Sequence, residues 1–175
     1  MNGKFIALCL VLIPIMFGLI MYYLQVYAYY RVVVSDGVSD VILTRKKDGG
    51  VEPIFYTNFQ GIDSESSPIR YRACFKVPTS INSLKELYVV VEDAEPLTAP
   101  AWFDCYQAES LGKKIQEGLA TSFLSIENII FGIDRVVTVL PNGDAFSWTK
   151  INRCGHLAFN GKSLPKSCKD QLERK

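Results

Sequence analysis

The chain has 175 residues, of which 49% are hydrophobic and 21% are charged, values that are ordinary for a folded globular protein. The formal net charge of +1 lacks the basic excess that nucleic-acid binding usually requires, so no nucleic-acid partner is expected. Of the 19 Lys and Arg residues only Lys4 precedes position 31, which leaves 18 cations and 18 anions for one domain with a neutral surface.

The chain begins with a long apolar run. Residues 5–30 contain no charged side chain, and residues 5–26 read FIALCLVLIPIMFGLIMYYLQV. As a helix this run would cover about 33 Å, enough to cross a hydrocarbon layer of about 30 Å. It is longer than the apolar core of about 7–15 residues in a cleaved signal peptide. Residues 1–31 are therefore predicted to be a transmembrane anchor, with cleavage near Val26-Tyr27-Ala28 as the alternative.

Tyrosines crowd the C-terminal end of this anchor. Tyrosine favours the headgroup layer, because its ring is apolar and its hydroxyl group needs water. Tyr23, Tyr27 and Tyr30 also follow i, i+4, i+7 spacing, which places them on one helix face. They form either an interfacial belt or a stripe of candidate partner contacts toward a neighbouring membrane subunit.

Short strands and helices follow the anchor. Residues 69–76 alternate, with Tyr71 and Phe75 on one side and Arg70 and Arg72 on the other. The other predictions are strands at 32–34, 38–44 and 51–59, a polar loop at 61–68, a helix capped by Ser80 with Ile81, Leu84 and Leu87 on its apolar side, a strand at 88–91, a helix at 101–117 that stops at Gly118, and a strand at 121–126.

The strongest local pattern is a hairpin near the end of the chain. Asn-Gly separates two strand-like runs, residues 133–140 and 145–151. With a two-residue turn, Val139 would face Phe146 and Arg135 would face Lys150, an unfavourable pair. The predicted fold class is α+β, a small, mainly antiparallel sheet of about five strands with one or two helices on one face. Residues 169–175 are predicted to be a polar tail that lies outside the folded domain.

Four cysteines lie in the domain predicted at residues 32–168: Cys74, Cys105, Cys154 and Cys168. An even count in a small domain indicates two disulfides, which persist in an oxidising compartment. Three pairings are possible. Pairing of Cys74 with Cys105 and of Cys154 with Cys168 is favoured, because these are the nearest partners along the chain. The charges that flank the anchor do not decide its orientation, so the cysteines place the domain outside the cytoplasm. Without a Cys-x-x-Cys pair, neither a metal nor a cofactor is predicted.

No group of residues marks a reaction, and the protein is not predicted to be an enzyme. His156 is the only histidine, and the acidic groups at 63–65 and 92–95 are interpreted as solvated loops. Arg70 and Arg72 could bind an anion or an acidic partner, or pair internally with carboxylates. Trp102 could belong to an exposed docking patch or pack in the core.

Several stretches resemble an uncharacterised family of short, single-span envelope proteins of alphaproteobacteria: MYYLQVYAYY, GIDSESSPIRYRACF, PLTAPAWFDCY, GIDRVVTVLPNGDAFSW and INRCG. The resemblance implies a bacterial inner-membrane location, but it implies no activity. Together with the orientation that the cysteines indicate, the expected arrangement is a cytoplasmic N-terminus and a periplasmic domain. The expected function is that of a non-catalytic accessory or assembly subunit of a larger inner-membrane complex, respiratory or photosynthetic. The expected partners are integral membrane subunits and the lipid bilayer. The alternative is a tethered ligand-binding or sensing module that uses the Arg70/Arg72 face.

Overall fold

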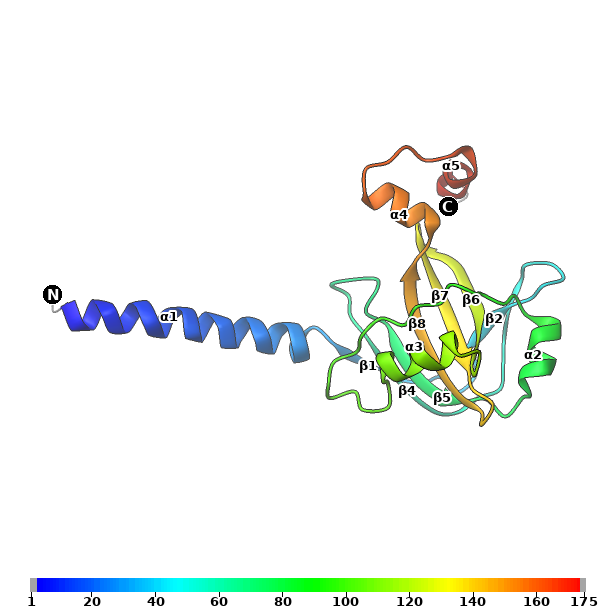
Figure 1. The fold of residues 1–175 in the computed structure, drawn as a ribbon, viewed down its shortest axis with the longest axis horizontal. Helices are drawn as coiled ribbons and strands as arrows, with labels where there is room; N and C mark the ends of the chain where they lie inside the picture. Colours follow the sequence, from blue (N-terminus) through cyan, green and yellow to red (C-terminus); the bar gives the residue numbers. More distant parts are fainter. Residues whose placement is uncertain (1–2, 174–175) are drawn as a thin grey trace.

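The apolar residues at the N-terminus form one long helix that stands apart from the rest of the chain (Figure 1). In the computed structural model, which describes residues 3–173, helix α1 covers Gly3–Tyr23 and continues into a π-helical turn, η1, at Leu24–Ala28. Pro14 lies inside α1 without ending it, and no side chain of α1 is buried. Within residues 3–173, the domain therefore covers no side chain of α1 completely.

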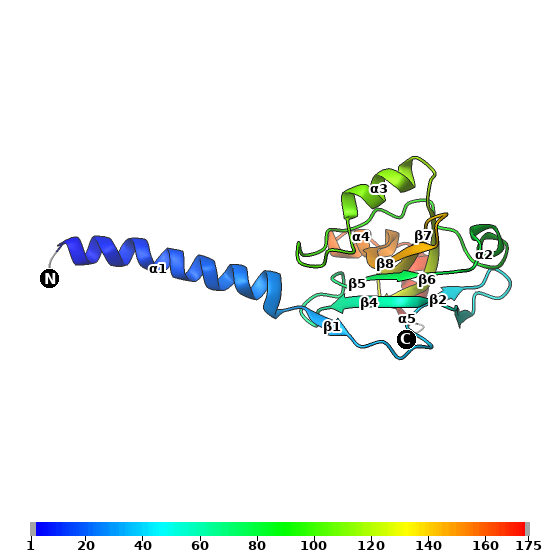
Figure 2. The ribbon, with the colours of Figure 1, turned by 90° about the horizontal axis from the view of Figure 1, so that it is seen from below.

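The domain is built on one antiparallel sheet, seen from two directions in Figures 1 and 2. Its strands, in the order in which they lie side by side, are β1 (Arg31–Val33), β4 (Thr57–Asp63), β5 (Arg72–Lys76), β8 (Asp144–Ile151), β7 (Ile133–Val139) and β6 (Thr121–Ile130). A ribbon of β2 (Ile42–Thr44) and β3 (Val51–Pro53) packs beside β6. There Thr44 Oγ1 donates a hydrogen bond to the Ser125 carbonyl oxygen at 2.8 Å.

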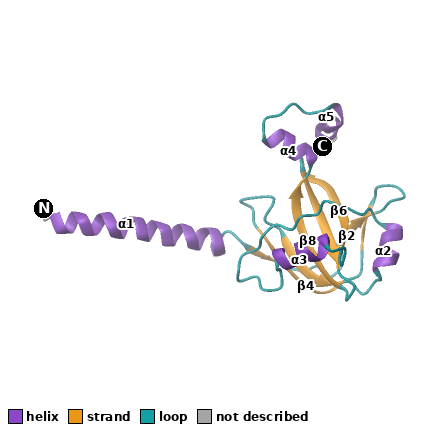
Figure 3. Cartoon of the chain, in the orientation of Figure 1, coloured by secondary structure: helices purple, strands orange, loops and turns teal. Residues whose placement is uncertain are grey.

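Short helices lie around the sheet, and one of them, α3, lies over a face of it (Figure 3). They are α2 (Ile81–Leu87), α3 (Ala108–Gln116), α4 (Arg153–Phe159) and α5 (Lys166–Glu173). Ser80 caps α2 as predicted, because its side chain accepts a hydrogen bond from the Ser83 N–H. Asn152 caps α4 in the same way. Gly118, with a φ of 70°, adopts the left-handed conformation that commonly follows the end of a helix, which agrees with the predicted stop.

Side chains that alternate along the strands produce an apolar core on each face of the sheet. Phe75 and Phe123 lie in the first core, together with Leu84 of α2. Trp148 lies in the second core, which Leu111 of α3 helps to cover. The predicted α+β class with a mainly antiparallel sheet is therefore confirmed, and helices contribute to both faces.

The hairpin of β7 and β8 forms, but its predicted register is wrong by one residue. The Leu140 N–H donates to the Asp144 carbonyl oxygen at 2.8 Å, so the loop has three residues. Gly143 has a φ of 83°, the left-handed conformation that the last residue of such a loop requires. As a result Arg135 faces Thr149, and Lys150 faces Asp134 instead of another cation.

Several predicted boundaries also need correction. The helix predicted at 101–117 begins only at Ala108, because residues before it turn to place Phe103 in the second core. β4 extends into the predicted loop at 61–68, and residues 88–91 form isolated bridges instead of a strand. The predicted polar tail is helical as far as Glu173, and residues 174–175 lie outside the described part.

Candidate functional site

The junction between helix and domain is built from aromatic side chains of two distant parts of the chain. The indole Nε1 of Trp102, in the loop before α3, donates to the Val26 carbonyl oxygen in η1 at 2.7 Å. The Trp102 ring stacks on Tyr27, with centroids 6.3 Å apart, and meets Tyr30 edge-on at 5.9 Å. Tyr23 stacks on Tyr27 at 5.9 Å. The helix thus enters the domain through four contacting rings, which we call the aromatic junction.

The hydrogen bond from Trp102 satisfies one of the carbonyl groups that are left unpaired at the end of every helix. Carbonyl groups in the last turn of a helix lack donors within the helix. Here the Tyr30 N–H donates to the Tyr27 carbonyl oxygen at 3.2 Å, and the indole N–H supplies a donor for Val26. The predicted stripe of Tyr23, Tyr27 and Tyr30 therefore has its first partner within the same chain, a contact that helix periodicity alone does not reveal.

Arg70 lies at the edge of the aromatic junction. Its guanidinium group is 5.6 Å from the centroid of the Tyr30 ring and donates to Ser66 Oγ at 3.3 Å. Arg31, at the start of β1, forms an ion pair with Glu65, which lies next to Ser66 in the loop after β4. The predicted role of Arg70 in partner contacts remains a prediction.

Arg72, by contrast, is buried and is not available at a surface. Only 4% of the residue is exposed, and its N–H groups donate to main-chain carbonyl oxygens at 2.7–3.2 Å. Burial lowers the pKa of the Arg72 guanidinium. The carbonyl groups belong to Ile69, Tyr71, Leu97 and Thr98. Internal pairing therefore describes Arg72, although its partners are carbonyl groups and not the carboxylates considered from the sequence.

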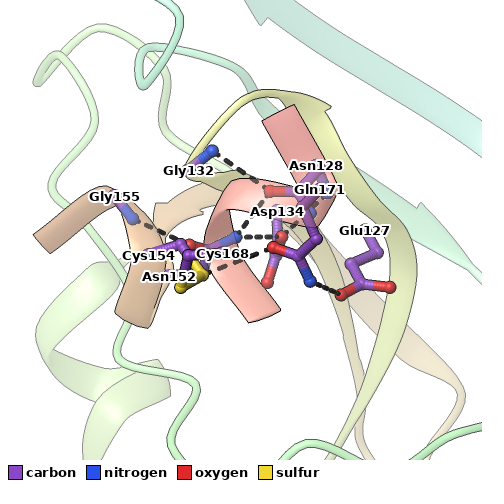
Figure 4. The surroundings of a disulfide bond; sticks show 9 residues. All are labelled: Glu127, Asn128, Gly132, Asp134, Asn152, Cys154, Gly155, Cys168 and Gln171. Carbon is purple, nitrogen blue, oxygen red and sulfur yellow. Dashed lines mark hydrogen bonds between the residues drawn. A yellow bond between two sulfur atoms is a disulfide. The ribbon is translucent and has the colours of Figure 1, made fainter. Parts of the chain in front are cut away.

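Both disulfides join the cysteines that are nearest along the chain. The Cys74–Cys105 bond ties β5 to the loop before α3, and the Cys154–Cys168 bond joins α4 to α5 (Figure 4). The favoured pairing is thus confirmed. Cys9, in α1, is free.

Helices α4 and α5 form a C-terminal cap, residues 153–173, that projects from the end of the β7–β8 hairpin opposite its turn (Figure 1). Asn152 Nδ2 donates to Asp134 Oδ1 at 2.7 Å and to Asn128 Oδ1 at 3.0 Å (Figure 4). Gln171 Nε2 donates to Glu127 Oε1 at 3.1 Å. Amide side chains therefore connect the cap to β6 and β7.

A hollow of about 570 Å³ lies between α4 and the segment at residues 93–97, which we call the strap. The Lys150 Nζ donates to Asp93 Oδ1 at 2.7 Å at its edge, and this bond lowers the pKa of Asp93. Arg153 and His156, both exposed, come from α4. From the sequence, His156 and the acidic group at 92–95 were considered separately, and Arg153 was not predicted, although i, i+3 spacing already places it beside His156 on one helix face.

The remaining candidates from the sequence are dispersed. Asp63 accepts a hydrogen bond from the Ser64 N–H and Glu65 pairs with Arg31, whereas Asp93 lies on the strap and pairs with Lys150. Among residues 3–173, no group of three or more His, Cys, Asp and Glu side chains could hold a metal ion.

Residues 41–169 match the model of a family described as "Family of unknown function (DUF6446)". The match covers more than half of the chain, so the chain belongs to this family, in agreement with the resemblance to an uncharacterised family. No curated protein and no solved structure shows significant similarity to the chain. The matched range contains the four cysteines of the disulfides and most of the sheet.

Proposed function

We propose that the protein is a non-catalytic accessory or assembly subunit of a larger inner-membrane complex, and that it docks through its Tyr-rich helix and its extracytoplasmic domain. The observation that carries this proposal is the aromatic junction. Trp102 binds the end of the helix by a hydrogen bond and two ring contacts, so that helix and domain form one oriented unit. A subunit that contacts its complex inside and outside the bilayer gains from such preorganisation, because less orientational freedom is lost on binding.

The proposed location is the bacterial inner membrane, with the N-terminus in the cytoplasm and the domain in the periplasm. The helix at Gly3–Ala28 is long and apolar enough to cross a membrane by length and composition. The two disulfides support an oxidising compartment for the domain. An impermeant protease added to spheroplasts should remove the domain, whereas protection of the domain would contradict this orientation.

The helix surface supports a partner in the bilayer. Its side chains are exposed on all sides, and Tyr22, which lies outside the aromatic junction, is 60% exposed. Because α1 buries no side chain against the domain, it can pack against neighbouring membrane helices without loss of an internal contact. Tyr23 and Tyr27 also keep exposed edges that a neighbour could contact.

The test is purification of the tagged full-length chain from its native membrane in a mild detergent, followed by quantitative mass spectrometry. We expect integral membrane partners at stoichiometric yield. A Trp102→Ala variant should recover them several-fold less well, because the helix and the domain are no longer held in one orientation. Trp102→Phe is the matched control, since it keeps a ring in the junction.

The outcomes separate the parts of the proposal. A wild-type chain recovered only as a lone monomer contradicts the accessory role. Equal recovery by wild type and Trp102→Ala contradicts the argument from the junction. In every sample, the mass checks that the Cys74–Cys105 and Cys154–Cys168 bonds are intact, and a cooperative thermal unfolding transition shows that the domain is folded.

A further inference from the structure

The hollow beside the C-terminal cap has the size and lining of a small-molecule site. Its volume of about 570 Å³ lies within the range of about 300–1,000 Å³ that is usual for ligand pockets. Its lining combines four aliphatic side chains with charged side chains. The aliphatic ones come from four separate places in the chain: Ile69, Leu97, Ile151 and Leu157.

The walls of the hollow are held in place by the fold, so the site does not need to be formed by its ligand. The Trp148 Nε1 donates to the Glu95 carbonyl oxygen at 2.9 Å, and Lys150 Nζ donates to the Asp93 carbonyl oxygen at 2.8 Å. Arg72 Nε donates to the Leu97 carbonyl oxygen at 3.0 Å. Three side chains of the sheet thus fix the strap on one side. On the other, the Asn152 side chain caps α4 and donates to Asp134 and Asn128, which fixes the start of α4.

The charges around the hollow are only partly neutralised. Lys150 is paired with Asp93. Within residues 3–173, the side chains of Arg153 and His156 form no hydrogen bond or ion pair, and neither does the Glu95 carboxylate. After Thr149 the chain carries seven Lys and Arg residues against two acidic residues, so this end of the molecule is positive. The free guanidinium group of Arg153 is suited to bidentate binding of a carboxylate or phosphate.

We propose that this hollow binds an amphiphilic anion. The apolar part of the ligand lies on the aliphatic side chains, and its carboxylate or phosphate group is bound by Arg153, with His156 beside it. The Glu95 carboxylate, on the opposite wall, accepts a hydrogen bond from a hydroxyl or ammonium group where the ligand carries one. This site differs from the Arg70/Arg72 face considered from the sequence and does not depend on the proposed accessory role.

The experiment uses the full-length chain in nanodiscs of phosphatidylcholine. The probes are hexyl phosphate and hexanoate, with hexyl glucoside as the uncharged amphiphile and inorganic phosphate as the anion without a chain. His156 is the only histidine, so a chain with a histidine-free tag and ¹³C-labelled histidine gives one ring signal at the site. We expect both anionic amphiphiles to shift this signal saturably. The two comparison probes should bind about tenfold more weakly or worse.

Two exposed cations of the cap separate specific binding from general attraction. Arg153→Gln should weaken binding of both anionic probes about tenfold, because a charge-assisted contact is lost. Lys162→Gln removes the same charge from the same cap outside the hollow and should leave binding unchanged. A thermal unfolding midpoint equal to that of wild type shows that each variant is folded.

Several results would overturn the proposal: no saturable binding of either anionic probe, equal binding of hexyl glucoside or inorganic phosphate, or equal weakening by Lys162→Gln and Arg153→Gln. Nanodiscs that contain phosphatidylglycerol identify the source of the ligand. Competition by this lipid assigns the site to an anionic membrane lipid, and undiminished binding of hexyl phosphate assigns it to a soluble amphiphile.

Discussion

The N-terminal helix and the C-terminal cap are both attached to the outside of the sheet domain, but by different kinds of contact. The helix is held by rings, since Trp102 packs against Tyr27 and Tyr30 and adds one hydrogen bond. The cap is held by amide side chains around Asn152 and is closed by the Cys154–Cys168 bond.

The difference follows from what each segment can bury. The end of the helix carries large aromatic side chains, and ring pairs contribute beyond the apolar area that they bury. The cap buries little more than Cys154, Gly155 and Cys168, while Phe159 and Leu172 are exposed. A segment with so little core commonly depends on a covalent cross-link. The stability of the cap and that of the junction should therefore respond differently to removal of the disulfide, to a larger side chain at a close contact, and to acid.

The largest effect is expected when the bond of the cap is removed. In the Cys154→Ser/Cys168→Ser double variant, the free energy of unfolding of the cap should fall by about 3 kcal/mol, the chain-entropy value for closing a loop of about 15 residues. Hydrogen exchange should show faster exchange in residues 153–173 and unchanged exchange in residues 24–30. Cys9→Ser is the matched control, because this cysteine is free. Unchanged protection of the cap would show that its amide contacts are sufficient alone.

A slightly smaller effect is expected where the cap closely approaches the turn between β6 and β7. A Cβ atom added at Gly155 would lie 2.2 Å from the Gly132 carbonyl oxygen and 2.8 Å from Ile151 Cγ2. Gly155→Ala should therefore destabilise the fold by about 1–3 kcal/mol, measured by denaturant unfolding.

Gly112→Ala in α3 is the control for this substitution. There the nearest atom to an added Cβ is Pro96 Cγ at 3.7 Å, an ordinary contact. Because alanine favours a helix over glycine, this variant should be neutral or more stable by up to about 1 kcal/mol. An equal loss of stability in both variants would contradict the close approach of cap and sheet.

A third effect concerns the aromatic junction. Trp102→Ala removes two ring contacts and one hydrogen bond to η1, which should weaken the junction by about 1–3 kcal/mol. Hydrogen exchange should become faster in residues 24–30 and stay unchanged in the cap, the reverse of the cysteine variant. Trp102→Phe should weaken the junction about half as much as Trp102→Ala, because it removes only the N–H donor and part of the ring. Unchanged exchange in residues 24–30 would show that the junction does not hold the helix.

The features that could be predicted from the sequence are those that depend on neighbours along the chain. An uncharged apolar run defines the helix, Ser80 marks the start of α2, and Asn-Gly marks the hairpin. The disulfide pairing also followed from proximity along the chain, since the bonds span 31 and 14 residues.

The features that could not be predicted depend on contacts between distant residues or on one dihedral angle. The bond from Trp102 to Val26 joins residues 76 positions apart, and no periodicity reports it. The hairpin register depends on Asn142, which lacks the positive φ that a two-residue Asn-Gly turn requires, so the loop has three residues. The hollow joins Ile69, the strap and α4 only after the sheet has formed.

The smallest effect is expected at the ion pair of Asp93 and Lys150, which ties the strap to β8 beside the cap. The hydrogen bond from Lys150 lowers the pKa of Asp93 below its usual value of 3.8. A carboxyl group whose pKa is lowered by folding stabilises the fold above its unfolded-state pKa, and this contribution is lost as the pH falls through the folded-state pKa. Because the Asp93 side chain is 89% exposed, the contribution should stay below about 1 kcal/mol.

Asp93→Asn should accordingly be slightly less stable than wild type at about pH 7, and the two unfolding free energies should converge at about pH 2. Asp144→Asn, which breaks the pair with Lys76, should show the same convergence away from the strap. Lys150 also donates to the main-chain carbonyl oxygen of Asp93 at 2.8 Å, and this bond does not titrate. If Asp93→Asn and wild type had equal unfolding free energies at both pH values, the carbonyl contact alone would hold the strap. Acid would then leave the strap in place.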